Sequence, residues 1–416
     1  MTIVEINSAN YGSTGNIMLY IAKMARERGH VVYTCCPSSR SNRKKKIDNQ
    51  IWIGSSVSRN LHLLLNSITG FNGCFSIIDT FLFLRKIKRI APDVIHLHNL
   101  HNCYINLRML FRYIKANHIK VVWTLHDCWA MTGQCPHFTM IQCEKWKTGC
   151  HDCKQTNVFP RSKVDRTKTM WKLKRKWFTG VEDLTIVTPS RWLSDIASES
   201  YLKEYPTVVI NNGIDLSVFT PTPSTFRERY GIATDEKILL GVAHDWGYRK
   251  GIDVFIQLAQ EIGSQYRIVL VGVEEDILPQ LPPNIIAIKR THNQKELVEI
   301  YSAADLFVNP TREENFPTVN LEALACGLPV ITFNTGGSPE TIDAGTGIVV
   351  ESNEYSKLKE VLTDPSLTNR LSKESCRTHS KKYAAQDSFK AYIDLFEKMC
   401  SSARNASDAG SGRPVF

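Results

Sequence analysis

The sequence predicts an α/β protein with two doubly wound domains, in which helices cover both faces of parallel sheets. Three observations lead to this fold class. The chain has 416 residues, which is too many for one ordinary hydrophobic core and suggests two or three domains. Short apolar runs alternate with longer helical patterns, and this alternation starts again near Val208.

The expected strands are short runs that are mostly apolar on both faces, which is typical of strands buried in a parallel sheet. In the N-terminal half they are Ile3–Ile6, Val31–Cys36, Val94–Leu97, Val121–Leu125 and Thr185–Thr188. In the C-terminal half they are Ile238–Val242, Arg267–Val271, Ile285–Ile288, Leu306–Asn309 and Val330–Thr332. Helical patterns separate them. Within Glu296–Ala304, for example, Leu297, Ile300 and Tyr301 recur at the spacing of one buried helix face.

Turn-forming residues at 211–215 and a Pro-Thr-Pro sequence at 221–223 separate the two series of strands. We therefore expect an N-terminal domain over 1–205 and a C-terminal domain over 206–385. The last strong helix is expected over 386–400. The tail over 401–416 is rich in Ser, Ala, Gly and Asn, so we expect it to be disordered.

The composition is that of a soluble globular protein, with 43% hydrophobic and 22% charged residues. The first residues form an expected strand and not a signal peptide, and no window approaches the roughly 18 apolar residues of a membrane span. We therefore expect a cytoplasmic protein. The formal net charge of +10 favours anionic partners, namely nucleic acid, nucleotide phosphates or an acidic lipid surface.

The strongest functional signal is the run Arg312–Val330, which follows an expected strand and a break at Pro310. Open α/β sheets bind ligands on such loops, at the carboxyl ends of their strands. Glu314 and Glu322 are eight residues apart, and each carboxylate can accept two hydrogen bonds from a ribose diol or from sugar hydroxyls. In the alternative interpretation, Glu314 is a helix-start residue favoured by the helix dipole and Glu322 is an exposed surface residue.

Two other loops have features of phosphate sites. Arg249 and Lys250 precede Gly251 after the first strand of the C-terminal domain, and cations at a helix N-terminus form an anion site. Gly12 and Gly15 follow the first strand of the chain, where glycines allow the backbone to approach a phosphate closely. The alternatives are a solvated basic turn and a plain tight turn.

Histidines end two strands of the N-terminal domain. His98 follows Val94–Leu97, and His126 and Asp127 follow Val121–Leu125. Both positions lie at the edge where an open α/β sheet binds its ligand, so these three residues are candidate binding residues. A strand-end histidine with a purely structural role is the alternative.

Three elements of the chain resemble the signatures of glycosyltransferase family 4. Glu314–Val330 resembles the E-x7-E signature with its trailing E-A-x-A-x-G-x-P-V, Asn211–Phe219 resembles the N-G-(I/V)-D-x-x-x-F linker, and Asn334–Glu340 resembles the later G-G-x-x-E element. The resemblance covers nearly the whole chain. It implies a GT-B fold, in which two Rossmann-like domains face a cleft and the helix over 386–400 returns to the N-terminal domain. It also implies retaining transfer without a catalytic metal.

The resemblance assigns the donor side as follows. Glu314 contacts the donor sugar and Glu322 contacts the ribose. Four residues line the donor pocket through their backbone: Asn315, Phe316, Pro317 and Thr318. The family usually has Gly where Pro317 stands, and Pro317 lacks an N–H, so the pattern of backbone contacts differs here.

The remaining family positions concern the diphosphate and the acceptor. Lys250 matches a lysine of the family, whereas the family's arginine position holds His244, which leaves Arg249 and His244 as candidates for the second cation. The first N-terminal loop faces the diphosphate through Gly15 and the acceptor through Gly12.

His126 matches a histidine that touches the transferred sugar, and His98 and Asp127 lie on the same acceptor side. The expected catalytic residues are therefore Glu314, Lys250 and His126. Since the leaving phosphate can take the acceptor's proton, His126 is assigned to binding and polarisation.

Five cysteines lie within 26 consecutive positions, together with His137 and His151: they are Cys128, Cys135, Cys143, Cys150 and Cys153. Cys150 and Cys153 form a C-x2-C pair, but no second pair completes a strong zinc pattern. A structural zinc, buried thiols and a labile disulfide all remain possible for this loop.

The segment Arg161–Phe178 interleaves eight Lys or Arg residues with Trp171, Leu173, Trp177 and Phe178. Such a stretch suits an anionic membrane surface, and it also suits single-stranded nucleic acid. A solvated helix face is the alternative.

Taken together, these features predict a retaining glycosyltransferase that moves a hexosyl-type sugar from a nucleotide-diphosphate sugar to a glycan acceptor. We expect the acceptor to be carried on a lipid at the inner face of the cell membrane, in the assembly of O-antigen, lipopolysaccharide or exopolysaccharide. No cofactor and no nucleic-acid partner are expected. The alternatives are a nucleotide-sugar epimerase of the same architecture and a nucleic-acid-binding protein.

Overall fold

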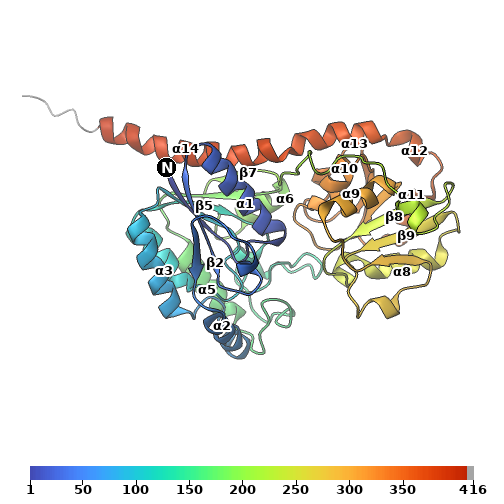
Figure 1. The fold of residues 1–416 in the computed structure, drawn as a ribbon. Helices are drawn as coiled ribbons and strands as arrows, with labels where there is room; N and C mark the ends of the chain where they lie inside the picture. Colours follow the sequence, from blue (N-terminus) through green and yellow to red (C-terminus); the bar gives the residue numbers. More distant parts are fainter. Residues whose placement is uncertain (410–416) are drawn as a thin grey trace, which may run out of the picture. The chain divides into compact units, whose positions relative to one another are not determined.

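The computed structural model describes the backbone of residues 1–409, and the side chains of these residues except 368, 369 and 402–409. The chain divides into two compact units (Figure 1). The N-terminal unit comprises Met1–Phe138, Gln142–Ile210 and the described part of the chain from Ser388. The C-terminal unit comprises Thr139–Ile141 and Asn211–Asp387. The division after Ile210 differs from the boundary expected at 205/206, because residues 207–209 form a strand of the N-terminal sheet.

The N-terminal unit is built on one parallel sheet of seven strands, in the order β3-β2-β1-β4-β5-β6-β7. The strands are β1 Thr2–Ile6, β2 Val31–Pro37, β3 Gln50–Ile53, β4 Val94–Leu97, β5 Lys120–Thr124, β6 Leu184–Thr188 and β7 Thr207–Val209. The helices are α1 Gly12–Glu27, α2 Ser56–Thr69, α3 Ile77–Ile90, α4 Leu107–Ala116, α5 Thr167–Phe178, α6 Arg191–Glu199 and α14 Ala385–Ala409. Every residue of β4 and β6 is buried, as expected when helices cover both faces of a sheet.

The C-terminal unit has a parallel sheet of six strands in the order β10-β9-β8-β11-β12-β13. The strands are β8 Lys237–Val242, β9 Tyr266–Val271, β10 Ile285–Ile288, β11 Leu306–Asn309, β12 Val330–Phe333 and β13 Gly347–Val350. The helices are α7 Phe226–Arg229, α8 Ile252–Glu261, α9 Gln294–Ala303, α10 Thr318–Ala325, α11 Tyr355–Thr363, α12 Leu367–Arg370 and α13 Lys373–Ser380. In chain order, β9 and β10 are added on one side of β8, whereas β11, β12 and β13 are added on its other side. The loops that follow the parallel neighbours β8 and β11 therefore lie next to each other at the carboxyl edge of the sheet.

The two doubly wound parallel sheets confirm the predicted fold class, and all ten expected strands are present. Three further strands, β3, β7 and β13, were not predicted. All three are edge strands, and each is short and partly exposed. A strand that is covered on only some of its surface lacks the continuous apolar run by which the buried strands were recognised.

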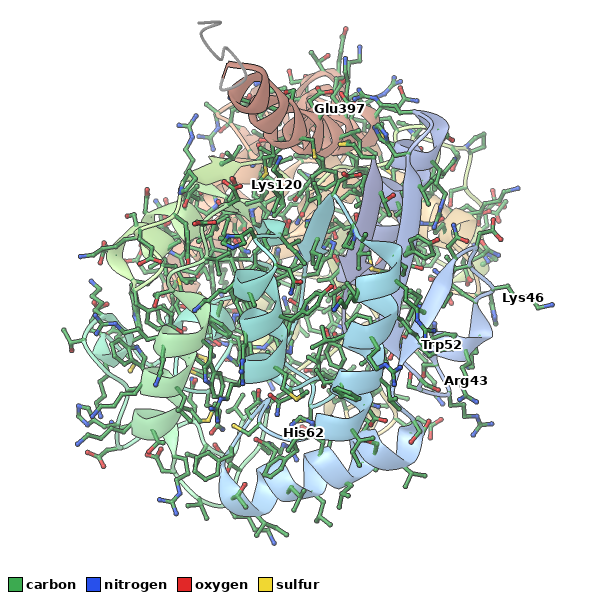
Figure 2. The ribbon with its side chains drawn as sticks, turned by 90° about the vertical axis from the view of Figure 1, so that its left-hand side faces the viewer. Arg43, Lys46, Trp52, His62, Lys120 and Glu397 are labelled. Atoms are coloured by element: carbon green, nitrogen blue, oxygen red, sulfur yellow. The ribbon has the colours of Figure 1, made fainter. Side chains whose placement is uncertain are left out.

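Two side chains of helix α14 contact α1 and the turn that follows α1. The Phe389 ring stacks on Tyr20 with 5.5 Å between the ring centroids, and Asp394 pairs with Arg28 at 2.7 Å. Figure 2 labels Glu397 further along the same helix. This helix continues to Ala409, so the expectation of disorder from residue 401 is wrong for residues 401–409. The residues from 401 to 409 include no Gly or Pro, and extending an existing helix costs little. Residues 410–416 of the expected tail lie outside the described residues.

The aromatic residues of α5 pack into the core of the N-terminal unit. Trp171, Trp177 and Phe178 are buried, and Lys174 between them is fully buried. The expectation that these aromatics face a membrane is therefore wrong. The exposed side of α5 carries only charged and polar side chains, which corresponds to the solvated-face alternative.

Candidate active site

The loop between β11 and α10 and the turn before α8 bring two of the expected donor-site residues into contact. The ammonium group of Lys250 donates a hydrogen bond to the Glu314 carboxylate and forms an ion pair with it. Lys250 ends the short turn Tyr248–Lys250, and Gly251 caps the start of α8. Gly251 has φ +78°, and a Cβ there would lie 2.5 Å from the Pro310 carbonyl oxygen. Only glycine allows the turn to approach the end of β11 this closely.

Arg312 connects the loop after β11 with the turn before α8. Arg312 is buried, with 7% of the residue exposed. Its guanidinium group makes two parallel hydrogen bonds to Asp253, each of 2.8 Å, and lies 3.8 Å from the centroid of the Tyr248 ring. Its backbone N–H donates to the Arg249 carbonyl at 2.8 Å. A bidentate Arg–carboxylate pair has a fixed geometry, so Arg312 holds the loop of Glu314 and the turn of Lys250 in a defined relation.

Two glycines after β12, Gly336 and Gly337, pack against the backbone of Glu314 and Asn315. Gly336 has φ +54°, and a Cβ there would lie 1.8 Å from the Glu314 carbonyl oxygen. The next residue, Gly337, donates its N–H to the Asn315 carbonyl at 2.8 Å. The two glycines therefore allow backbone-to-backbone packing that fixes residues 314 and 315.

Glu322 lies inside α10, and its carboxylate accepts a hydrogen bond of 3.0 Å from the Tyr301 hydroxyl. Burial raises the pKa of Glu322 to about 7, although the Tyr301 bond acts in the opposite direction. A carboxyl group with this pKa is partly protonated at neutral pH, and it becomes a full acceptor once it is ionised.

We expect donor binding to be linked to ionisation of Glu322. Ribose hydroxyls that donate to the carboxylate stabilise its ionised form, so a nucleotide-diphosphate sugar should bind more tightly as pH rises from 6 to 8 and should release a proton on binding at pH 6.5. Calorimetric titration in buffers of different ionisation enthalpy measures this release. Glu322→Gln should abolish it, and wild-type protein that releases no proton would contradict the ribose assignment.

The other residues expected on the donor side belong to two segments, the one that follows β8 and the one that follows β11. His244 is exposed, and Arg249 lies 3.8 Å from Asp245. Asn315 and Phe316 are buried, and the loop ends at Pro317, which caps α10 before its first residue, Thr318. Glu314 therefore stands on the loop and Glu322 within the helix.

In the N-terminal unit, His98 and His126 lie side by side at the ends of β4 and β5. Nδ1 of His98 is 3.0 Å from Nε2 of His126. The ring planes differ by 8° and the ring centroids are 5.3 Å apart, which fits an in-plane N–H···N hydrogen bond. Gly12 opens α1 and Gly15 lies in its first turn, after the end of β1.

Glu5 on β1 was not among the predicted residues, although it contacts His98. Its Oε2 lies 2.8 Å from Nε2 of His98 and 2.8 Å from Nδ1 of His96, and all three side chains are buried. Burial alone would raise the pKa of Glu5, but His96 and His98 beside it hold that pKa at about 2. Burial lowers the pKa of His98 to about 4.

Asp127 has a structural partner on each oxygen. One oxygen accepts a bond of 2.9 Å from His101, and the other accepts the backbone N–H of Trp129 at 2.8 Å. Burial would raise the pKa of Asp127, and His101 holds it at about 2. These contacts fix the start of the loop that contains the cysteines.

The five cysteines of this loop are thiols and form no disulfide with one another. Burial raises the pKa of Cys150, whose sulfur accepts the Gly133 N–H at 3.1 Å, to about 11. A hydrogen bond from Cys135 lowers the pKa of Cys153 to about 7. Among the described residues, only Glu5, His96 and His98 bring three potential metal-ligand atoms within 4.8 Å of one another, so the cysteines do not form a ready zinc site.

The sequence contained signals for the residues that were missed. Glu5 is a charged residue in an otherwise apolar strand. Lys174 is in helical register with Trp171, Trp177 and Phe178, the apolar residues of α5.

Comparisons with known proteins match both units. The family described as Glycosyltransferase Family 4 matches residues 14–218, and the family described as Glycosyl transferases group 1 matches residues 224–382. The protein named colanic acid biosynthesis glycosyl transferase WcaC, from Escherichia coli (strain K12), is 29% identical over 331 residues, which cover 76% of this chain and 79% of the relative.

Two solved structures show the same fold over nearly their whole length. Sucrose-phosphate synthase from Thermosynechococcus elongatus has a TM-score of 0.72 and 17% identity, and the match covers 97% of this chain and 99% of that one. Anabaena HepE, solved in complex with UDP-glucose, has a TM-score of 0.65 and 15% identity, and the match covers 98% and 100%. At these identities the likeness concerns the fold alone.

Proposed function

The chain belongs to the glycosyltransferases, as a GT-B protein with a family 4 domain and a group 1 domain, and on this premise we propose that it transfers a sugar from a nucleotide diphosphate to a glycan with retention of the anomeric configuration. HepE was solved with UDP-glucose and WcaC is named for colanic acid biosynthesis. A nucleotide-diphosphate sugar as donor and a surface polysaccharide such as O-antigen or exopolysaccharide as product are consistent with both.

The observation that carries this proposal is the contact between Lys250 and Glu314, on two segments that Arg312 holds together. During transfer, the bond from the anomeric carbon to the diphosphate oxygen breaks and the diphosphate keeps the electron pair. The Lys250 cation stabilises this growing negative charge, which is strongest in the transition state. Glu314 accepts hydrogen bonds from the donor sugar.

The acceptor hydroxyl oxygen then bonds to the anomeric carbon on the face that the diphosphate leaves, and its proton passes to the departing phosphate. This route needs no enzyme base. His126 contributes by binding the transferred sugar. Burial lowers the pKa of His126 well below its usual value, so it binds as an uncharged imidazole. Since side-chain cations balance the diphosphate, we expect no requirement for a catalytic metal.

The proposal is tested by offering UDP-, GDP- and ADP-sugars with a panel of glycan acceptors and weighing the products by mass spectrometry. One donor should yield an acceptor heavier by one sugar, with and without EDTA. Activity that EDTA abolishes and that Mg²⁺ or Mn²⁺ restores would overturn the assignment of Lys250. Conversion of the donor into an isomer in the absence of an acceptor would support the epimerase alternative.

We propose further that the acceptor is carried on a lipid and that the enzyme docks on the membrane through α2 and α3. Among residues 1–409, no helix combines the length and the apolar character needed to cross a bilayer. Eight apolar side chains on these two helices are each at least half exposed: Val57, Leu61, Leu64, Ile68, Ile77, Ile78, Phe81 and Leu82. We call them the α2–α3 surface. In Figure 2, α2 lies along the lower edge of the drawing, and the labelled His62 belongs to its buried face.

Charge around the α2–α3 surface favours an anionic lipid partner. The exposed face of α3 is apolar in its first half and basic in its second half, and Arg85 lies 6.0 Å from the Phe81 ring. The neighbouring loop over 158–164 adds Arg161 and Lys163, and its Lys163 N–H bonds to the Ser67 carbonyl of α2. Asp79 is the sole acidic residue within 56–69, 77–90 and 158–164, and it accepts a hydrogen bond from Ser58. A basic residue near an anionic surface contributes about 1 kcal/mol of attraction.

Flotation with phosphatidylglycerol-rich vesicles tests this surface. The triple variant Leu61→Ser, Leu64→Ser and Ile78→Ser should lose vesicle binding, because it removes exposed apolar area without touching the core. Wild-type binding should weaken at 1 M salt, where the Debye length falls to about 3 Å.

The matched control replaces Lys168, Lys172 and Lys176 on the exposed side of α5 with Ser, and it should float as the wild type does. An apolar triple variant that still floats would place the docking surface elsewhere. A wild-type dimer that this variant dissociates would instead assign the surface to a second copy of the chain.

A further inference from the structure

Side-chain hydrogen bonds connect Glu5 in the N-terminal sheet, through His98, with His126. Oε2 of Glu5 on β1 lies 2.8 Å from Nε2 of His98, which follows β4, and Nδ1 of His98 lies 3.0 Å from Nε2 of His126. On the opposite side, the same Glu5 oxygen lies 2.8 Å from Nδ1 of His96. Nε2 of His96 is 2.8 Å from the Thr124 hydroxyl, which also contacts the Tyr392 hydroxyl of α14 at 3.4 Å.

The ionisation of these groups leaves one arrangement of protons on the side towards His126. Glu5 is a carboxylate and can only accept, so Nε2 of His98 carries a proton. His98 is neutral because burial depresses its pKa, and its second nitrogen, Nδ1, therefore accepts. The proton between the two histidines must then belong to Nε2 of His126. Burial keeps His126 neutral as well, so its Nδ1 is an acceptor nitrogen.

On the far side of Glu5, Nδ1 of His96 lies 2.8 Å from the same carboxylate oxygen. Nε2 of His96 lies 2.8 Å from the Thr124 hydroxyl, which donates its proton to the Tyr392 hydroxyl. The carboxylate sets the tautomer of His98, and through His98 it also sets the tautomer of His126.

We propose that Glu5 is a positioning residue, which acts through His98 to hold His126 in the Nε2–H tautomer and thereby presents Nδ1 of His126 as the acceptor for a hydroxyl group of the transferred sugar. This inference rests on the proposed function, which places His126 at that sugar. The opposite tautomer would present an N–H there, and an N–H does not accept a hydroxyl proton. An acceptor nitrogen at this position favours a hydroxyl group of the donor sugar over a group that can only accept a hydrogen bond.

The same three side chains, Glu5, His96 and His98, have the spacing of a metal site. Oε2 of Glu5 and Nε2 of His98 already share a hydrogen bond, so the link from Glu5 to His126 is complete without an ion. The two possibilities differ in a measurable way, because a metal would take the place of the proton on Nε2 of His98.

Two-bond ¹H–¹⁵N correlation spectra of the full chain labelled with ¹⁵N-histidine test the proposal directly. At pH 7, His126 and His98 should be Nε2–H tautomers, with assignments from His126→Gln, His98→Gln and His96→Gln. An Nδ1–H or doubly protonated His126 in the wild type would overturn the proposal. A stoichiometric metal in purified protein, found by elemental analysis, would also overturn it. Neither measurement requires a variant of Glu5 to fold.

Two variants separate positioning from a structural role. Glu5→Gln should give His126 a mixture of tautomers and lower kcat on the order of 10-fold or more, with the KM for the donor changed little, because a wrong histidine tautomer impairs the chemical step. Thr124→Val is the matched control. It removes a buried hydroxyl on the far side of Glu5 and should leave the His126 tautomer unchanged.

If folded Glu5→Gln keeps a pure Nε2–H tautomer at His126, the proposed link is wrong. If the tautomer changes and kcat does not, the role of His126 in the proposed function fails, while the link from Glu5 stands.

Discussion

Lys250→Ala is expected to lower kcat/KM for sugar transfer by a factor of about 10²–10³ without unfolding the protein. The ammonium group pairs with Glu314 at the carboxyl end of the C-terminal sheet and is not part of either hydrophobic cluster of that unit. Removing it leaves the growing charge of the diphosphate unbalanced in the transition state. Steady-state kinetics with the preferred donor measure the loss, and circular dichroism checks the fold.

A matched control exists in the same unit. Lys289 forms an exposed ion pair with Glu275, and Lys289→Ala removes the same group without touching the candidate site. Its activity should equal that of the wild type. If Lys250→Ala were as active as the wild type, the diphosphate would be stabilised by other groups. Arg249 and His244 would then be the next residues to test.

Lys174→Met is expected to destabilise the N-terminal unit by about 3 kcal/mol. Lys174 is fully buried and donates hydrogen bonds to the carbonyl groups of Trp129 and Thr132, and its Nζ lies 3.6 Å from the centroid of the Trp129 ring. Methionine matches its length but leaves two buried carbonyl groups without these partners, at about 1–3 kcal/mol for each. Urea denaturation measures the difference. A variant as stable as the wild type would contradict the structural role assigned to this residue.

The effect of Lys174 should also depend on pH. Burial lowers its pKa to about 7, from 10.5 in an unfolded chain. Between pH 7 and 10.5 the unfolded chain therefore binds a proton that the folded protein lacks, and stability rises with pH. Lys174→Met should lack this contribution, so the destabilisation should be larger at pH 9 than at pH 6.5. If the stability difference between the wild type and Lys174→Met became smaller as pH rises, the lowered pKa of Lys174 would be contradicted.

Sequence reasoning recovered the central strands because a strand buried on both faces has an apolar run that needs no tertiary information. Edge strands such as β3 and β7 lack this run, and they were missed. The same distinction applies to the site. Lys250 and Glu314, which the structure brings into contact, could be singled out because each belongs to a motif with a fixed local spacing.

Glu5 and Lys174 could not be assigned in the same way, since their partners are far away in the sequence. Glu5 contacts His98, 93 residues on, and Lys174 bonds to carbonyl groups more than 40 residues away. Counting charges in 161–178 suggested a membrane surface, whereas packing places Lys174 and the aromatic residues of α5 inside. The exposed apolar residues of α2 and α3 became apparent only once the structure showed which helix faces lack a partner.

The central claim, retaining transfer from a nucleotide-diphosphate sugar, is tested most directly by the anomeric configuration of the first product formed. Proton NMR during the reaction of an α-linked donor with a soluble acceptor distinguishes the two outcomes through the coupling constant of the anomeric proton. We predict that the newly formed linkage is α, as in the donor. A β-linked product would contradict the account, because it would require attack from the face opposite the diphosphate and a general base that the proposed mechanism does not include.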